Sequence, residues 1–494
     1  LQAVRTHYVA LQANLSDLPQ RQRSAQAVLL TAWSLLSAQE AQILAHCSVF
    51  RGGFTLAAAQ QIVGAIVADL EALVNKSLLH RTDANRYTQH ELVRQFAADQ
   101  LTAQGTSTPL LHDSHAHYYL VLLEQWQPGT AAEQRFRLTI QADLANVEAA
   151  WDWTLASEQV IRLADVVEGL AQFYDLVNDY YAAEAILQRS VAQVRAHLAA
   201  SQFAAIDQTR LHVLLAALLI KLAEIYSVNL SQFQPARTLA EEGLTYAQTA
   251  ANAQLLANGY YSLQAAAFGE MDYLRGQELA LTGVELAQQH GLRREQMRCL
   301  YGAGMNATGH HDHATALTYL AQAIALAQEA NDTRLAQEFR NGLGVVYRNL
   351  GDFAQATACF EENLHLLRQE GSQLQIALAT ANLGILRLWL GAYMPATTYL
   401  VAGQQACMAI GEKRIGTEIL VILGQLYGQT GEYAHAITCC QEALTLAQPH
   451  DYPAAQIFAW LTLGDLYLRT HEVDAAQAAY TQAHTASQRP DAAT

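Results

Sequence analysis

Lysine is scarce in this sequence of 494 residues: only three of its 29 basic residues are lysines, and 45 acidic residues give a net charge of −16. An acidic excess of this size argues against a general surface for nucleic acids or anionic membranes. Long hydrophobic runs are also missing, since the longest, Val213–Ile220, stops at Lys221, short of the ~20 apolar residues that a spanning helix needs. Because neither a signal peptide nor a methionine opens the sequence, we expect a piece of a longer protein.

Several kinds of reactive site are missing as well. The six cysteines form no CxxC pair and are typical of small buried side chains in a reducing compartment, so we predict a cytoplasmic protein. No catalytic triad, paired-carboxylate pattern or GxxxxGK[ST] loop occurs, and we predict no enzyme activity in this chain. The cluster His310–His313 lies on a repeat turn, and His112, His115 and His117 are poorly spaced for one metal, so we predict no metal site.

The charge that is present is unevenly distributed. Residues 1–101 have a net charge of +1, whereas residues 102–494 have a net charge of −17. A nearly neutral head and a strongly acidic remainder indicate two modules with different roles.

A 40-residue register runs through the second module. Seven positions spaced by 40 hold an aromatic ring or imidazole in six cases, and a small residue follows each by three. Five consecutive repeats also have glycine nine residues before this position. A fixed period of this length is the signature of a solenoid. The seven positions are Phe233, Tyr273, His313, Phe353, Tyr393, Tyr433 and Val473.

The residues of one repeat predict its local structure. Gly351 suits the tight turn between two helices, and Asp352 stands where it can cap the second helix. Gly344 and Ala356 are small, as expected where two helix backbones approach closely. Neither helix can bury its apolar stripe alone, so each repeat needs its neighbour.

This pattern resembles the tetratricopeptide repeat family. Leu343-Gly344-x-x-Tyr347, followed by Ala356 and Phe360, matches the family consensus, although the usual period is about 34 residues and longer helices are implied here. The segment Leu170–Ser190 fits the same frame as a first unit. The resemblance implies an all-α superhelical solenoid of about eight helical hairpins over residues 158–490.

In this family, one stripe of the first helix of each repeat lines a concave groove. The resemblance therefore implies a groove that binds a peptide, a protein or a small-molecule inducer. The alternative is that these are ordinary solvated helix positions. Carried by 40 residues, the stripe contains Asn258, Tyr261, Arg298, Tyr301, Glu338, Asn341, Arg348, Trp389, Glu418 and Gln425.

The head, residues 24–101, reads as four helices, a hairpin and a final helix. Ser37 and Glu40 form a capping box for the second helix, and Thr55 caps the third. Residues 78–81 and 86–89 alternate around a short turn and predict the hairpin. A helical bundle closed by one hairpin is a winged helix.

Five short sequence segments in or next to residues 24–101 resemble the winged helix that follows the nucleotide-binding core of STAND-class (NB-ARC) ATPases. The resemblance implies that His90 senses the β-phosphate of ADP, although Gln89 and Glu91 depart from the family's Met-His-Asp motif. The alternative is a histidine that caps a helix. The segments are Arg21–Ser24, Trp33–Ser37, Phe50–Phe54, Leu73–Leu79 and His90–Ala97.

The two resemblances together imply the regulatory and sensor portion of a STAND-type ATPase. Residues 1–23 would end the segment after a missing nucleotide-binding core, and residues 102–157 would form a helical elbow containing Trp151 and Trp153. We expect no cofactor in this chain, and we expect ADP or ATP to bind only when the upstream core is present. The full-length protein could also oligomerise. The alternative is a freestanding scaffold that holds two partner proteins together.

Winged helices also bind DNA, so that function must be weighed. The third helix, Thr55–Val63, has no positive charge, and only Arg81, Arg86 and Arg94 near the wing could touch phosphate. We therefore do not expect nucleic acid as a partner of this chain.

Overall fold

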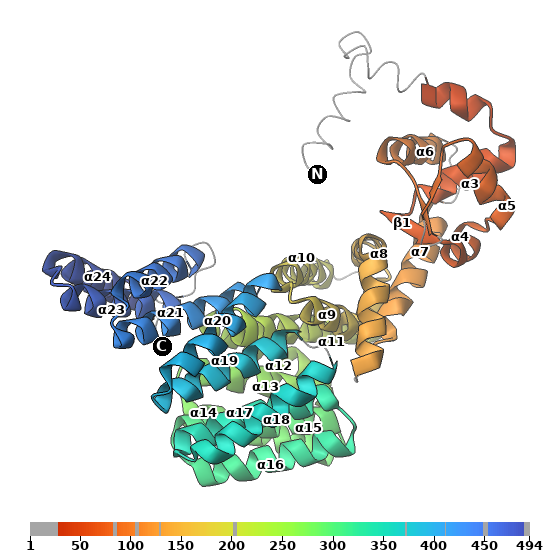
Figure 1. The fold of residues 1–494 in the computed structure, drawn as a ribbon. Coiled ribbons are helices and arrows are strands. Elements are labelled where there is room, and N and C mark those ends of the chain that lie inside the picture. Colours follow the sequence, from red (N-terminus) through yellow and green to blue (C-terminus); the bar gives the residue numbers. More distant parts are fainter. Residues whose placement is uncertain are drawn as a thin grey trace. The chain divides into compact units, whose positions relative to one another are not determined.

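The structure is a computed structural model that describes residues 28–488, except 83–85, 104–107, 128–129, 201–204, 371–372, 411 and 448–452. The segments Arg21–Ser24 and 1–23 thus lie outside the described residues. The chain divides into two compact units, which Figure 1 colours along the sequence. The first contains the described residues up to Gln125 and Leu138–Val166. The second contains Trp126–Arg137 and the described residues from Val167 onward.

The first unit contains the predicted winged helix, with one strand more than expected. Its three strands pair antiparallel in the order β1-β3-β2. The elements, in chain order, are a helix at 28–34, α3 (Ala38–Cys47), β1 (Gly53–Thr55), α4 (Leu56–Val63), α5 (Val67–Asn75), β2 (His80–Arg81), β3 (Arg86–Thr88) and α6 (Glu91–Ala103).

Local sequence signals set the helix boundaries of this unit. The predicted capping box is confirmed, because Ser37 Oγ accepts from Glu40 N at 3.2 Å and Ser37 N donates to the Glu40 carboxylate at 2.7 Å. Thr55 Oγ1 accepts from Ala58 N at 3.2 Å and caps α4, also as predicted.

The unexpected strand β1 is held by the helix α8 (Thr130–Ala156). Asn146 accepts a hydrogen bond from Arg51 N at 2.6 Å and donates one to Gly53 O at 2.7 Å. Asp143 interrupts the helical backbone with φ −120° and forms an ion pair with Arg86 on β3. These bonds satisfy backbone groups that lie at the edge of the small sheet.

The two tryptophans of α8 pack inside the first unit. Trp151 is completely buried. Trp153 donates from its ring nitrogen to Asp113 on α7 (Thr108–Glu124) at 2.8 Å and stacks on His112 with ring centroids 4.4 Å apart. The single turn η1 (Val160–Asp165) follows α8.

The second unit (Figure 1) is a row of helical pairs, and its described helices form eight of them: the seven predicted from the 40-residue register and the first unit predicted at Leu170–Ser190. The pairs are α9 (Val167–Val177) with α10 (Tyr180–Ala199), α11 (Ala205–Glu224) and the π turn η2 (Ile225–Asn229) with α12 (Phe233–Thr249), α13 (Ala253–Gly269) with α14 (Tyr273–Gln289), α15 (Arg293–Gly309) with α16 (His313–Glu329), α17 (Thr333–Leu350) with α18 (Phe353–Glu370), α19 (Gln373–Trp389) with α20 (Tyr393–Ala409), α21 (Lys413–Thr430) with α22 (Tyr433–Ala447), and α23 (Pro453–Arg469) with α24 (Val473–Ser487).

The predicted chemistry of the repeat is confirmed at residues 344–360. Gly351 has φ +86°, and Asp352 caps α18 by accepting from Gln355 N at 3.1 Å. Gly344 faces the fully buried ring of Phe360, where a Cβ would lie 2.5 Å from Cε1. The close crossing of the two helices therefore needs a residue without a side chain at position 344.

The row curves toward the first helices of the pairs. Successive first helices contact one another from α9 to α23, whereas no comparable contacts join successive second helices among the described residues. The first helices consequently lie on the inner side of the curve. We call the surface formed by α9, α11, α13, α15 and α17 the inner face.

One segment of the second unit is apolar and long enough to cross a membrane, but most of it is buried among the repeats. The segment Asp207–Asn229 passes by length and composition, and 72% of its apolar window is buried. The pair α4 and α5 passes only if it is taken as one span bent by 109°. The ion-paired Lys221 in the first segment is consistent with a core helix of the solenoid.

The helix crossing generates a prediction for Gly344→Ala. The added Cβ must displace Phe360, and overpacking of this kind costs about 1–3 kcal/mol, more than the up to ~1 kcal/mol that Ala gains over Gly in a helix. We expect chemical denaturation to show a net loss of roughly 1–2 kcal/mol. Asn349→Ala, at an exposed position of the same helix, should change stability by less than ~0.5 kcal/mol. A Gly344→Ala protein as stable as the wild type would contradict the close crossing.

Candidate functional site

The 40-residue register places polar and aromatic side chains in columns on the inner face. Arg298 and Glu338 occupy one column on α15 and α17, and Arg294 and Arg334 occupy another, four residues earlier on the same helices. Four residues make about one helical turn, so the two columns lie on the same side of each helix.

Arg298 joins three helices of the inner face. Its guanidinium lies 3.9 Å from the ring centroid of Tyr261, and its Nη1 donates to the Asn258 amide oxygen at 3.4 Å, both on α13. It also forms an ion pair with Glu224 on α11, reaching past the helix between them. The structure therefore brings together three of the predicted residues, Asn258, Tyr261 and Arg298.

Lys221 extends this network to α9. Its Nζ lies 2.8 Å from the carboxylate of Glu168 and 3.2 Å from that of Glu224, and the residue is 6% exposed. Burial alone would lower the pKa of Lys221, but the two carboxylates outweigh it and raise the pKa. Lys221 is therefore a buried cation that needs both acidic partners.

The pKa of Glu224, one of the two acidic partners, is likewise set by burial and by the charges beside it. Burial would raise its pKa, but Arg298 and Lys221 outweigh burial and lower the pKa to about 2. The pKa of Arg298 is correspondingly raised, because Glu224 and Tyr261 outweigh the effect of burial. We call Glu168, Lys221, Glu224, Tyr261 and Arg298 the inner ion network.

A second ion pair connects helices that are far apart in sequence. Arg334 Nη1 on α17 lies 2.7 Å from the carboxylate of Asp175 on α9, across 159 residues of sequence. Arg334 Nε lies 3.9 Å from the Glu133 carboxylate, in the segment Trp126–Arg137 of the same unit. The inner face therefore curves far enough for α17 to meet α9.

Arg294 has a guanidinium with unused hydrogen-bonding capacity. It lies 4.6 Å from the ring centroid of Trp126 and 3.7 Å from the Asp332 carboxylate, and its buried Nε has no hydrogen-bond partner among the described residues. Burial, and then the nearby positive charge of Arg298, lower the pKa of Arg294. A carboxylate brought to Arg294 would thus be attracted strongly.

Glu338 is an acidic side chain of the inner face without a partner. It makes no hydrogen bond or ion pair to any residue that the structure describes. Burial raises its pKa, and the nearby Arg334 and Arg298 only partly offset this effect. Glu338 is therefore available to a ligand that carries a cation or a hydrogen-bond donor.

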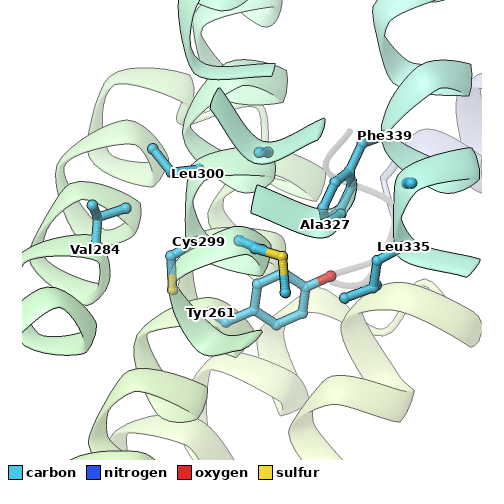
Figure 2. Packing of buried hydrophobic residues seen from close by; sticks show 10 residues of the cluster. Tyr261, Val284, Cys299, Leu300, Ala327, Leu335 and Phe339 are labelled. Carbon is cyan, nitrogen blue, oxygen red and sulfur yellow. The ribbon is translucent and has the colours of Figure 1, made fainter. Parts of the chain in front are cut away.

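Buried aromatic side chains pack next to the charged residues of the inner face. Tyr261 belongs to a buried cluster with Cys299, Leu335 and Phe339 (Figure 2). The predicted residue Tyr301 stacks on Phe339 with ring centroids 4.9 Å apart. Burial raises the pKa of both tyrosines, so their hydroxyls stay protonated at neutral pH.

The remaining predicted groove residues make local contacts between neighbouring repeats. Asn341 accepts a hydrogen bond from Asn382 on α19 at 3.0 Å. Arg348 lies 5.0 Å from the ring centroid of Trp389, which is 54% exposed at the end of α19. Neither pair contacts the inner ion network through a bond seen in the structure.

Two predicted residues lie further along the row. Glu418 pairs with Arg414 on the same helix at 2.9 Å. Gln425 donates to Thr462 on α23 at 3.5 Å. The structure places these residues on α21, away from the inner face as defined by α9 to α17.

The predicted nucleotide sensor His90 is exposed before α6. Its Nδ1 accepts a hydrogen bond from Leu92 N at 3.3 Å, which is a helix-capping contact. Capping is compatible with a further role toward phosphate, and that role stays a prediction.

All three arginines near the wing have acidic partners. Arg81 lies 2.9 Å from Glu71, Arg94 lies 2.6 Å from Glu91, and Arg86 pairs with Asp143. These pairs leave little free positive charge for a phosphate backbone.

The histidine cluster of the repeat turn has structural contacts. His310 lies 2.6 Å from Gln277, and Asp312 caps α16 through Thr315 N at 3.2 Å. Within the described part of the chain, no group of three or more His, Cys, Asp or Glu side chains is placed to hold a metal ion.

Sequence reasoning missed Lys221, Glu224, Arg294, Arg334 and Asp175. Two signals were available: a lysine that ends the longest apolar run, and a pair of arginines exactly one repeat apart, one helical turn before Arg298 and Glu338. No periodic signal marks Asp175, because its contact depends on how far the row curves.

Two family patterns match parts of the chain. A winged helix-turn-helix domain matches residues 36–102, and a tetratricopeptide repeat matches residues 338–362 and 417–450. No curated protein sequence is detectably similar to the chain.

Two solved structures show the same fold. One is a Signal Transduction ATPase with Numerous Domains (STAND) protein with a tetratricopeptide repeat sensor from Pyrococcus horikoshii, with 15% identity, a TM-score of 0.56 and coverage of 92% of this chain. This chain spans 64% of that protein's length. The other is a Rap protein complexed with Competence and Sporulation Factor, with 14% identity, a TM-score of 0.50, and coverage of 73% of this chain and 98% of that one. At these identities the similarity establishes the fold alone.

The inner ion network predicts how stability depends on pH. The pKa of Glu224 in the folded chain lies below its ordinary value of 4.5, so its stabilising effect is complete above about pH 4.5 and is lost as the pH falls toward 2. Removing one partner of a buried pair costs on the order of 3 kcal/mol. We expect Glu224→Gln to lose roughly that amount at pH 7 in urea denaturation, and to converge with the wild type near pH 2–3.

The control for this prediction is Glu418→Gln, which breaks a half-exposed pair on α21 and should cost less than ~0.5 kcal/mol at any pH. A Glu224→Gln deficit that persists unchanged at low pH would show that the carboxylate's charge is not what stabilises the network.

Proposed function

We propose that the inner face of the repeats is a binding site for a short peptide with charged groups of both signs, and that this binding is a sensor function. The observation that supports it is a mixed-charge site in which Arg294 and Glu338 keep unused hydrogen-bonding capacity beside the inner ion network. A zwitterionic ligand can satisfy both at once, with a carboxylate at Arg294 and an ammonium at Glu338.

The buried aromatic side chains support a ligand with side chains rather than a bare ion. Tyr301 lies in the helix that carries Arg294 and Arg298, and Tyr261 lies under Arg298. Tyrosines supply large contact areas at low conformational cost, and arginines supply orientation. Tyrosine and arginine are both enriched among the residues that carry most of the binding energy at interfaces.

We further propose that the chain works as the regulatory and sensor part of a longer STAND-type ATPase. The order winged helix then repeats, the similarity in fold to the Pyrococcus horikoshii STAND protein and the sequence segment around His90 support this. In that protein the sensor is a tetratricopeptide repeat. Nucleotide would be held by the upstream core, with His90 at the start of α6 as its phosphate sensor.

A scaffold that joins two protein partners is the alternative function. It is favoured by exposed apolar side chains at the turn between α19 and α20, where Trp389 is 54% and Met394 81% exposed. The two functions differ in which surface a partner contacts, and substitutions separate them.

Peptide binding is tested with the whole chain and a synthetic library of peptides of five to ten residues, followed by titration calorimetry of the tightest binder. Glu338 makes no hydrogen bond or ion pair to a described residue, so we expect Glu338→Gln to leave the melting temperature unchanged or slightly raised while it weakens binding at least 10-fold. Glu418→Gln, at the same register two repeats later, should leave binding unchanged.

Two outcomes would contradict the proposed site. Binding that is insensitive to Glu338→Gln would place the ligand elsewhere. Loss of binding on Trp389→Ala together with Met394→Ala, with Glu338→Gln silent, would support the scaffold.

The ATPase-linked role is tested on a longer form of the protein that includes the region before Leu1. We expect it to retain tightly bound ADP after purification, and His90→Ala to release that ADP without unfolding the winged helix. A nucleotide content that is the same in both proteins would remove His90 from the sensor role.

A further inference from the structure

A short segment of the chain belongs to the repeat unit although both of its flanks belong to the other unit. The described residues of Trp126–Arg137 belong to the repeat unit, whereas Gln125 before them and Leu138 after them belong to the first unit.

The segment contacts two arginines of the inner face. The indole of Trp126 lies 4.6 Å from the Arg294 guanidinium, and the Glu133 carboxylate lies 3.9 Å from Arg334 Nε. Glu133 is 6% exposed and Phe136 is 5% exposed, so the segment is buried on this side. The segment thus places an aromatic ring over Arg294 and a carboxylate beside the Nε of Arg334, whose Nη1 is paired with Asp175.

The fit of the segment is incomplete. The Trp126 ring N–H is buried without a hydrogen-bond partner among the described residues, and the same holds for Nε of Arg294 and of Arg334. The separation of 3.9 Å between Arg334 and Glu133 also exceeds hydrogen-bond distance. A free ligand whose carboxylate reached either Nε would form bonds that the segment leaves unmade.

We propose that Trp126–Arg137 is an internal occupant of the ligand site, and that the ligand which displaces it is a short peptide that carries an aromatic side chain and a carboxylate. This inference rests on the proposed function and names its ligand class. The two arginines supply the selection: the guanidinium of Arg294 stacks on an aromatic ring, and the Nε of Arg294 or Arg334 can donate to a carboxylate.

Displacement has a consequence because the segment is covalently continuous with the first unit at both ends. A ligand that takes its place at Arg294 and Arg334 must free Trp126–Arg137, including the first turns of α8. The ligand's differential affinity for the freed state then sets how far the equilibrium moves.

The inference is tested by hydrogen–deuterium exchange of the whole chain, read by mass spectrometry over residues 130–137. We expect Arg334→Gln and Trp126→Ala each to raise exchange in this stretch at least 10-fold. Arg414→Gln occupies the same register two repeats later, on α21, where Arg414 pairs with Glu418, so it should leave the stretch at the wild-type rate. Circular dichroism checks that each variant keeps its helices.

A second arm needs no substitution. A synthetic peptide with the sequence of residues 126–137 is added to the wild-type chain at concentrations up to about 1 mM. We expect it to raise exchange over residues 130–137 of the protein, and the same peptide with the Glu133→Gln change to be at least 10-fold less effective.

The outcomes separate this inference from the proposed function. Unchanged exchange in Arg334→Gln and Trp126→Ala overturns the internal occupant, and an inactive segment peptide overturns the ligand class with an aromatic side chain and a carboxylate. A library peptide that binds through Glu338 while residues 130–137 keep their wild-type exchange overturns displacement and leaves the proposed function in place. If the segment's own peptide releases the segment while no library peptide binds, displacement stands and the proposed function is overturned.

Discussion

The pairing of Arg298 with Glu224 across α13 is the interaction on which the inner face depends. It ties α11 to α15, and Lys221 extends the same network to Glu168 on α9. A buried cation and a buried anion are each costly alone, so the network is stable only when its helices are held in one arrangement. The arrangement of helices that curves the row is therefore the same arrangement that keeps these buried charges paired.

The same constraint leaves other groups unsatisfied. With Glu224 and Arg298 paired to each other, neither Glu338 nor the Nε of Arg294 has a hydrogen-bond partner in the part of the chain that the structure describes. Native proteins rarely keep buried polar groups in this state, and such groups are commonly found where a ligand completes them. The unsatisfied groups lie on the two helices that also contact Trp126 and Glu133.

Periodicity in the sequence predicted the fold well and the site only in part. The 40-residue step identified seven of the eight helical pairs, with the first recognised from Leu170–Ser190. The step also placed Asn258, Tyr261 and Arg298 on one surface, because each repeat adds the same rotation. It missed Lys221 and Glu224, which precede the regular register, and Asp175, whose contact with Arg334 depends on curvature accumulated over 159 residues. In the head, the strand β1 was missed because its three residues are fixed by Asn146, 93 residues from Gly53.

The most direct test of the central claim is a crystal structure of the chain with its tightest library peptide bound. The account predicts that the peptide lies on the inner face, with a carboxylate at hydrogen-bond distance from Arg294 or Arg334 and a donor at Glu338. A peptide bound instead beside Trp389 and Met394, with the groups of the inner face unchanged, would contradict the account and favour the scaffold.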